Sequence, residues 1–178
     1  GNVLSYLDEV NHENDSYLKL MPPGIIKTYE GRIRSSLNSS EEARQNRKEL
    51  NSFFKSLAKS LSDANVKLLA GSDSGASNSY TYPGISLHQE LEAMVDAGIS
   101  NLKALQNSAY NGSQFLKKDS DYGTVTAGKI SDLVILNSNP LDDINNTRDI
   151  EFVIKGKDVF KPEINANEIN CMECIINK

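Results

Sequence analysis

Residues 66–75 read VKLLAGSDSG, a nearly continuous apolar run that stops at an aspartate set among serines and glycines. One helical pattern precedes the run and another follows it, which is typical of a strand of a parallel sheet covered on both faces. Active sites of α/β folds gather at the carboxyl ends of such strands. The sequence therefore predicts a strand at about residues 66–71 and makes Asp73 a candidate site residue.

The segment before this run predicts a long amphipathic helix. Ser39 and Glu42 have the spacing of a capping box. Apolar residues then recur every three or four positions, which predicts a helix over residues 41–64 with one buried face. The first forty residues show no such period, and we expect them to be irregular.

Two further helices are predicted after the aspartate. Ser86 and Gln89 repeat the capping signal for a helix at about residues 87–97. A third helix is expected over about residues 101–116. Helix, strand, loop and helix in this order form the repeating unit of an α/β barrel or a doubly wound sheet.

From Tyr122 onward the apolar pattern takes the period of β-strands. It predicts a strand near residues 132–136 and a hairpin over 151–160. A boundary near residue 120 would divide the chain into three parts, namely residues 1–120, the β-rich residues 121–160 and a polar tail at 161–178.

The composition is that of a soluble globular protein, with 38% hydrophobic and 24% charged residues among 178. The net charge is -5 and the basic residues form no stripe, so nucleic acid is not an expected partner. No apolar run approaches the roughly 20 residues that span a bilayer, so no membrane association is expected. The N-terminal stretch is too polar for the centre of a signal peptide, and a cytoplasmic location is favoured, although export stays open. Because Gly1 comes first, the chain reads as a piece of a longer one.

Asp73 could ligate a metal ion or accept a proton from a bound water, and Gly71 and Gly75 would let a ligand approach closely. The alternative is that Asp73 and Ser74 form a simple Asx-type turn. A serine nucleophile is disfavoured, because the G-x-S-x-G elbow would need serine where Asp73 stands. The Asp-Ser-Gly of trypsin-like proteases would need preceding β-barrel strands, and a long helix precedes Ser74 instead.

The cysteines, Cys171 and Cys174, form one CxxC motif near the C-terminus. A tetrahedral zinc site would need two more ligands, and the histidines, His12 and His88, lie far away in the sequence. A tail without metal is the favoured interpretation, and a zinc or redox module is the alternative.

Residues from about 22 to 160 resemble the C-terminal part of metal-dependent amidohydrolases, in the imidazolonepropionase-like and prolidase-like branch. The matching stretches are LLAGSDSG (68–75), PGISLHQELEAMVDAGIS (83–100), YGTVTAGKISDLVILNSNPLDDI (122–144) and VIKGKDVF (153–160). The resemblance implies an α/β fold, namely the C-terminal portion of a (β/α)8 barrel with its last strand and flanking helices, followed by strands of a small β-sandwich.

The resemblance also implies roles for individual residues. Asp73 would be the catalytic aspartate, which contacts a divalent metal, most readily zinc, and shuttles a proton from the attacking water. The substrate would be a small molecule with an amide, peptide-like or cyclic amide C–N bond. His88 matches a recurrent histidine of the SLHQEL stretch and is either a substrate-binding residue or a packing residue. Gly128, Lys129 and Asp132 would shape a turn.

The resemblance leaves part of the metal site without a counterpart. Family members carry an HxH pair and further histidines before the aspartate, whereas only His12 precedes Asp73 here. We therefore expect no tightly bound metal and no activity from this chain alone, and the remaining N-terminal barrel portion is an expected partner. Exposed strand edges also predict a homo-oligomer. The alternative function is a non-catalytic remnant that serves as a binding or oligomerisation domain.

Overall fold

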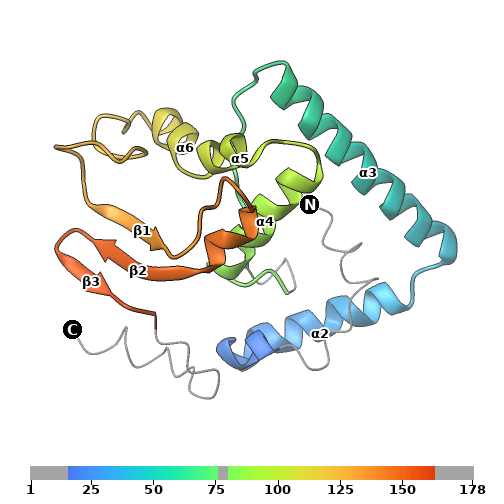
Figure 1. The fold of residues 1–178 in the computed structure, drawn as a ribbon. Coiled ribbons are helices and arrows are strands. Elements are labelled where there is room, and N and C mark those ends of the chain that lie inside the picture. The colour runs from blue at the N-terminus through green and yellow to red at the C-terminus, as the bar shows by residue number, and fades with distance from the viewer. Residues whose placement is uncertain (1–15, 76–79, 163–178) are drawn as a thin grey trace. The chain divides into compact units, whose positions relative to one another are not determined.

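The computed structural model describes residues 16–75 and 80–162 (Figure 1). In chain order its elements are η1 (Ser16–Leu20), α2 (Pro23–Leu37), α3 (Glu41–Asp63), α4 (Ile85–Asp96), α5 (Asn101–Ser108), α6 (Tyr110–Phe115), β1 (Asp132–Leu136), η2 (Ile144–Arg148), β2 (Ile150–Lys155) and β3 (Asp158–Phe160). Helices and a small antiparallel sheet together make an α/β protein. Within these described ranges, no helix combines the length and the apolar character that crossing a bilayer requires.

The chain divides into two compact units. Among the described residues, the first unit holds Ser52–Ser72 and Gly84–Pro162, and the second holds residues 16–51, 73–75 and 80–83. The change of pattern near residue 120 falls inside the first unit, where it separates helices from strands. The three predicted segments therefore remain a prediction.

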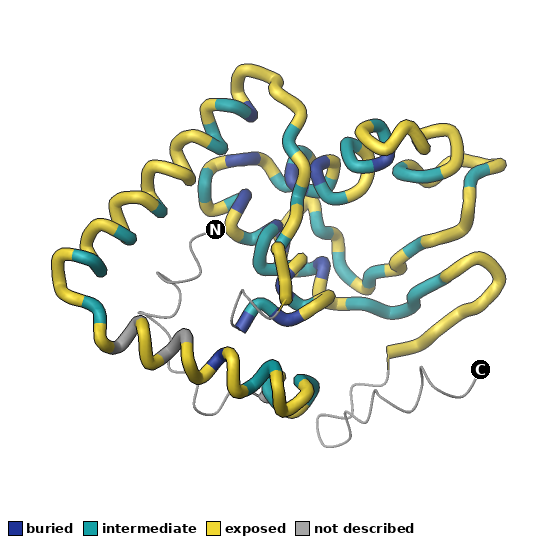
Figure 2. The backbone as a smooth tube through the Cα atoms, turned by 180° about the vertical axis from the view of Figure 1, so that it is seen from behind, coloured by how far each residue is buried: buried dark blue, intermediate teal, exposed yellow. Residues whose placement is uncertain are grey.

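The hydrophobic core of the first unit lies where α4, α5 and η2 meet. Its buried members come from these elements and the α4–α5 turn, namely Leu91, Met94, Ile99, Ala104 and Ile144. Leu68 and Ala70, from the run before the aspartate, pack against it. Figure 2 shows buried positions on α4 and α5, whereas most of α3 is exposed.

The sheet confirms the predicted β-rich region. Its strand order is β1-β2-β3, antiparallel throughout, with Val134 opposite Val153 and Lys155 opposite Asp158. Gly156 has φ 62 in the turn between β2 and β3, a left-handed conformation that glycine adopts without steric cost. The predicted strand at residues 132–136 and the hairpin at 151–160 are both confirmed.

The predicted helices at residues 41–64 and 87–97 are present, but the residue that caps each N-terminus differs from the predicted one. Helix α3 matches the predicted range, but Ser40 caps it in place of Ser39, since the Ala43 amide donates to the Ser40 hydroxyl at 3.1 Å. Helix α4 begins after Gly84, and Ser86 is buried inside the helix, so the predicted serine cap is wrong. At Gly84 no side chain caps the helix.

The predicted helix over residues 101–116 is broken in two at Ala109, whose φ of -127 and ψ of -63 leave the helical region. In a continuous helix the Asn107 carbonyl would accept from the amide of residue 111. Here it accepts instead from the Ala70 amide at 3.0 Å. The break therefore accompanies a long-range hydrogen bond that local periodicity does not reveal.

The expectation of irregular structure before residue 40 is wrong, because α2 occupies Pro23–Leu37 and η1 precedes it. Pro23 occupies the first helical position of α2, where the missing N–H of proline costs nothing. In the second unit, the buried ring of Tyr29 lies 5.0 Å from that of Tyr80 and 6.3 Å from that of Tyr82, measured between centroids.

Candidate functional site

The run before Asp73 does not form a β-strand in the structure, so the prediction at residues 66–71 is wrong for the described chain. A strand needs a hydrogen-bonding neighbour, and the described strands lie at residue 132 and beyond and pair with one another. Over Leu68–Ala70 the side chains still alternate as in a strand. Leu68 and Ala70 pack on the core and Leu69 between them is 45% exposed, whereas Val66 departs from this alternation and is 48% exposed.

Two asparagines anchor this run on α5 and α6. The Asn111 side-chain amide donates to the Leu68 carbonyl at 3.0 Å and to the Asn107 side-chain carbonyl at 2.8 Å. The Asn107 backbone carbonyl accepts from the Ala70 amide, also at 3.0 Å. The position of the run, which ends two residues before Asp73, therefore depends on two asparagines that no motif in the sequence indicated.

Asp73 lies two residues after this run and belongs to the second unit. Its side chain is exposed and its backbone has φ 51, a left-handed conformation that aspartate tolerates better than most residues. A carboxylate at the end of the run is the arrangement that the sequence predicted. Its catalytic role and the Asx-turn alternative both remain predictions.

The described residues do not make up a metal centre. Among residues 16–75 and 80–162, no three His, Cys, Asp or Glu side chains lie together as potential ligands of one ion. A catalytic zinc site uses about three protein ligands, so Asp73 would fill only one position of such a site. Cys171, Cys174 and His12 lie outside the described residues.

His88 lies in the first turn of α4 and is half-buried. Its Nδ1 atom lies 2.9 Å from the hydroxyl oxygen of Thr147, which comes from η2, 59 residues later. The Thr147 hydroxyl in turn donates to the Ile144 carbonyl at 2.9 Å. The structure therefore joins the predicted histidine to a buried threonine, a contact that no sequence motif indicated.

A neighbouring ion pair makes a second link between the same two elements. Arg148 donates through Nε and Nη2 to one carboxylate oxygen of Glu92, at 2.7 and 2.6 Å. Burial and the Arg148 charge lower the pKa of His88 below its ordinary 6.5, and the Glu92 carboxylate opposes them. The imidazole of His88 is therefore neutral near pH 7.

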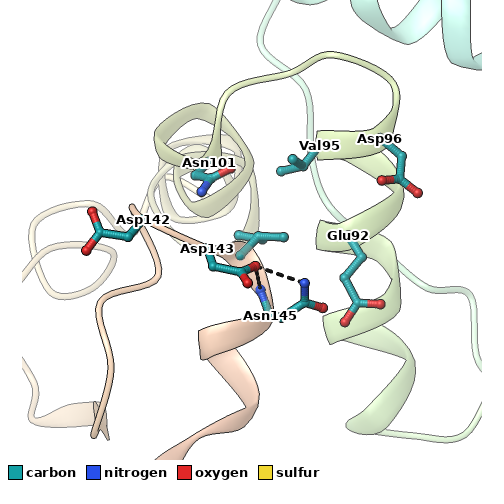
Figure 3. Close-up of a pocket in the computed structure, with 8 residues that line it drawn as sticks. Glu92, Val95, Asp96, Asn101, Asp142, Asp143 and Asn145 are labelled. Carbon is teal, nitrogen blue, oxygen red and sulfur yellow. Dashed lines mark hydrogen bonds between the residues drawn. The ribbon is translucent and has the colours of Figure 1, made fainter.

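A pocket of about 380 Å³ lies beside this link (Figure 3). Its lining residues come from α4, α5, the two residues before η2 and the start of η2, namely Glu92, Val95, Asp96, Asn101, Asp142, Asp143, Ile144 and Asn145. Asp143 is already engaged as the cap of η2, since it accepts from the Asn145 amide at 2.9 Å and from its side chain at 2.8 Å. No motif selected in the sequence indicated this pocket, and the signal that could have done so is the run of amide and acid residues NPLDDINN at 139–146.

The model of the amidohydrolase family matches residues 16–165, a range that includes Asp73 and His88. The chain belongs to the amidohydrolase family. This confirms the resemblance noted in the sequence. A search of curated protein sequences finds no match for this amidohydrolase chain.

Solved structures with a similar fold include a Xaa-Pro dipeptidase with bound methionine in its active site, with 22% identity and a TM-score of 0.58 over 78% of this chain and 34% of that one. An uncharacterized protein matches at 20% identity and a TM-score of 0.56, over 76% of this chain and 34% of its own. A molinate hydrolase matches at 21% identity and a TM-score of 0.50, over 77% and 30%. The amidohydrolase chain thus spans about a third of the length of each of these proteins.

Proposed function

We propose that the chain is the C-terminal portion of a metal-dependent amidohydrolase that hydrolyses amide, peptide-like or cyclic amide C–N bonds. One observation carries the proposal: the family match over residues 16–165 includes a carboxylate, Asp73, two residues after an apolar run. In this proposal Asp73 contacts the metal of the complete enzyme and accepts a proton from the attacking water. The metal is a divalent ion, with zinc the expected one.

The fold proposal is that the run at residues 66–71 becomes the last strand of a (β/α)8 barrel once neighbouring strands are present. Two observations support it: Val66 and Leu69 leave apolar side chains exposed in this run, and the chain covers only about a third of its structural neighbours. Strands β1, β2 and β3 would then belong to the small β-sandwich that the imidazolonepropionase-like or prolidase-like branch carries.

Both candidate site residues can perform simple acid and base chemistry. The carboxylate of the exposed Asp73 can act as a proton acceptor, and the half-buried neutral His88 can bind a substrate group by hydrogen bonding. The other metal ligands would come from outside the described residues, because Asp73 alone cannot hold a catalytic ion.

Dipeptides are the first substrates to test. The neighbour with a TM-score of 0.58 is a Xaa-Pro dipeptidase. A panel of Xaa-Pro dipeptides, with cyclic amides as a second group, covers the proposed substrate class.

The second candidate function is a non-catalytic remnant that binds a partner or a second copy of itself. One observation favours it: α3 carries uncovered apolar side chains, with Phe53 58%, Phe54 46% and Leu57 40% exposed. Exposed apolar side chains gathered on one helix are typical of an interaction surface. Sedimentation of the chain over a range of concentrations tests this alternative.

The deciding experiment compares the 178-residue chain with the same chain extended upstream in its own reading frame. We expect hydrolysis of Xaa-Pro dipeptides by the extended protein, loss of activity with a chelator and recovery with zinc. The 178 residues alone should be inactive. Chelator-sensitive hydrolysis by the short chain, or a reading frame with no barrel strands upstream, would overturn the proposal.

A further inference from the structure

The two links between α4 and η2 hold His88 from one side. Thr147 and Arg148 are consecutive in η2, and their partners, His88 and Glu92, lie one helical turn apart on α4. Positions four apart on a helix share a face, so both contacts form at once. A shift of η2 along α4 would break both contacts. The position of the His88 ring relative to η2 is therefore fixed by its own hydrogen bond and by the neighbouring ion pair.

The hydrogen-bond direction at Thr147 follows from its single proton. A threonine hydroxyl has one O–H to donate and two lone pairs to accept with. Thr147 is buried and donates to the Ile144 carbonyl at 2.9 Å. It must therefore accept from Nδ1 of His88, at 2.9 Å. The proton of a neutral His88 then sits on Nδ1, and Nε2 carries the lone pair.

We infer that Thr147 is a positioning residue that fixes His88 with its proton on Nδ1, so that Nε2 is presented as a hydrogen-bond acceptor to the N–H group of an amide or amine ligand. The ligand half of this inference rests on the proposed function. The positioning half concerns the chain alone. Among the described residues the ring forms its hydrogen bond to Thr147, and the half-buried imidazole keeps part of its surface open to solvent.

The charged groups around the ring favour the neutral form on which this acceptor depends. Burial lowers the pKa of His88, and the positive charge of Arg148 on η2 lowers it further, because each disfavours a positive charge on the imidazole. Glu92, on α4, acts against them but is itself paired with Arg148. The ion pair therefore limits the pull of the Glu92 carboxylate on the imidazole.

The positioning half is tested by NMR on the 178-residue chain labelled with ¹⁵N at histidine, at about pH 7.5. The chain has two histidines, and His88→Gln identifies the signals of His88 by their loss. We expect a protonated Nδ1 and an unprotonated Nε2 in the wild type. Thr147→Val should move the proton to Nε2, and Thr147→Ser should restore it to Nδ1. Thr126→Val, at an exposed threonine, is the matched control and should change nothing.

A wild-type spectrum with the proton on Nε2 would overturn the inference, even if Thr147→Val fails to fold. An unchanged tautomer in folded Thr147→Val would overturn the role of Thr147. Neither result depends on hydrolysis, so a failure here is distinct from a failure of the proposed function. In the extended enzyme, Thr147→Val should raise KM for a dipeptide several-fold with a smaller change in kcat. A fall in kcat at constant KM would overturn the ligand half.

Discussion

The side chain of Asn111 donates a hydrogen bond to the backbone carbonyl of Leu68 at 3.0 Å and thereby fastens the segment that leads to Asp73 onto α6. The same amide also donates to Asn107, at 2.8 Å. A segment without a β-ladder is therefore held by a side-chain hydrogen bond from Asn111 and a backbone hydrogen bond from Ala70 to Asn107.

Asn111→Leu should lower the free energy of unfolding by about 1 to 3 kcal/mol, because it removes two hydrogen bonds and leaves the Leu68 carbonyl without this donor. Urea titration measures the loss, and hydrogen exchange at the Ala70 amide should become faster. Gln106→Ala, at an exposed position of α5, is the control and should stay within about 0.5 kcal/mol of the wild type. Equal effects at both positions would argue against an anchoring role for Asn111.

Glu92→Gln should lower the pKa of His88 further, because the Glu92 carboxylate is the charge that raises it. NMR titration of the imidazole measures the shift. The loss of the half-exposed ion pair with Arg148 should cost less than about 1 kcal/mol. Glu90→Gln removes the same charge from α4 and should leave the His88 titration near that of the wild type. A rise in the His88 pKa in Glu92→Gln would contradict the electrostatic account.

The lowered pKa of His88 also predicts how stability depends on pH. The folded state binds a proton at His88 less readily than the unfolded state, whose pKa is near the ordinary 6.5. The stability that comes from the neutral ring is therefore fully present above pH 6.5 and is lost as the pH falls through the folded pKa. Urea titrations of the wild type and of His88→Gln across this window measure the effect, and the wild type should lose more stability on acidification. If the stability of the wild type and of His88→Gln fell in parallel with pH, the pKa of His88 would not be lowered by folding.

Gly123 and Gly112 should respond to alanine in opposite ways. Gly123 has φ +88, and an added Cβ would overlap the side chain of Ser113, so Gly123→Ala should lower the melting temperature. Gly112 lies in α6 with open space around an added Cβ, so Gly112→Ala should stabilise the protein by about 0.5 to 1 kcal/mol. Thermal unfolding followed by circular dichroism measures both. A stabilised Gly123→Ala variant would mean that this turn differs from the one described.

Asp73→Asn in the extended enzyme should lower kcat by about 10² to 10⁴-fold, because the amide keeps the shape of the side chain but cannot accept a proton. Far-UV circular dichroism should be unchanged, since Asp73 is exposed. Ser74→Ala is the matched control and should keep full activity, which also tests a serine nucleophile. Full activity in Asp73→Asn would show that the catalytic carboxylate lies elsewhere.

Local signals in the sequence were sufficient for the long helix at Glu41–Asp63, the strand at Asp132–Leu136 and the hairpin that follows. Each of these elements is specified by its own periodicity, its cap or its turn, and each forms mainly with near neighbours in the chain. The motif order also indicated the amidohydrolase family and the position of Asp73 after the apolar run. The sequence did not indicate α2 at Pro23–Leu37, because the first forty residues show no clear helical period of apolar residues.

Other features were decided only by the tertiary structure, because they depend on groups far apart in the chain. The contact from His88 to Thr147 spans 59 residues, and the pair between Arg148 and Glu92 spans 56. The break at Ala109 frees a carbonyl for Ala70, which no helical pattern can reveal. The apolar run at residues 66–71 has the composition of a strand but no ladder, since a strand is completed by a neighbour and not by its own sequence.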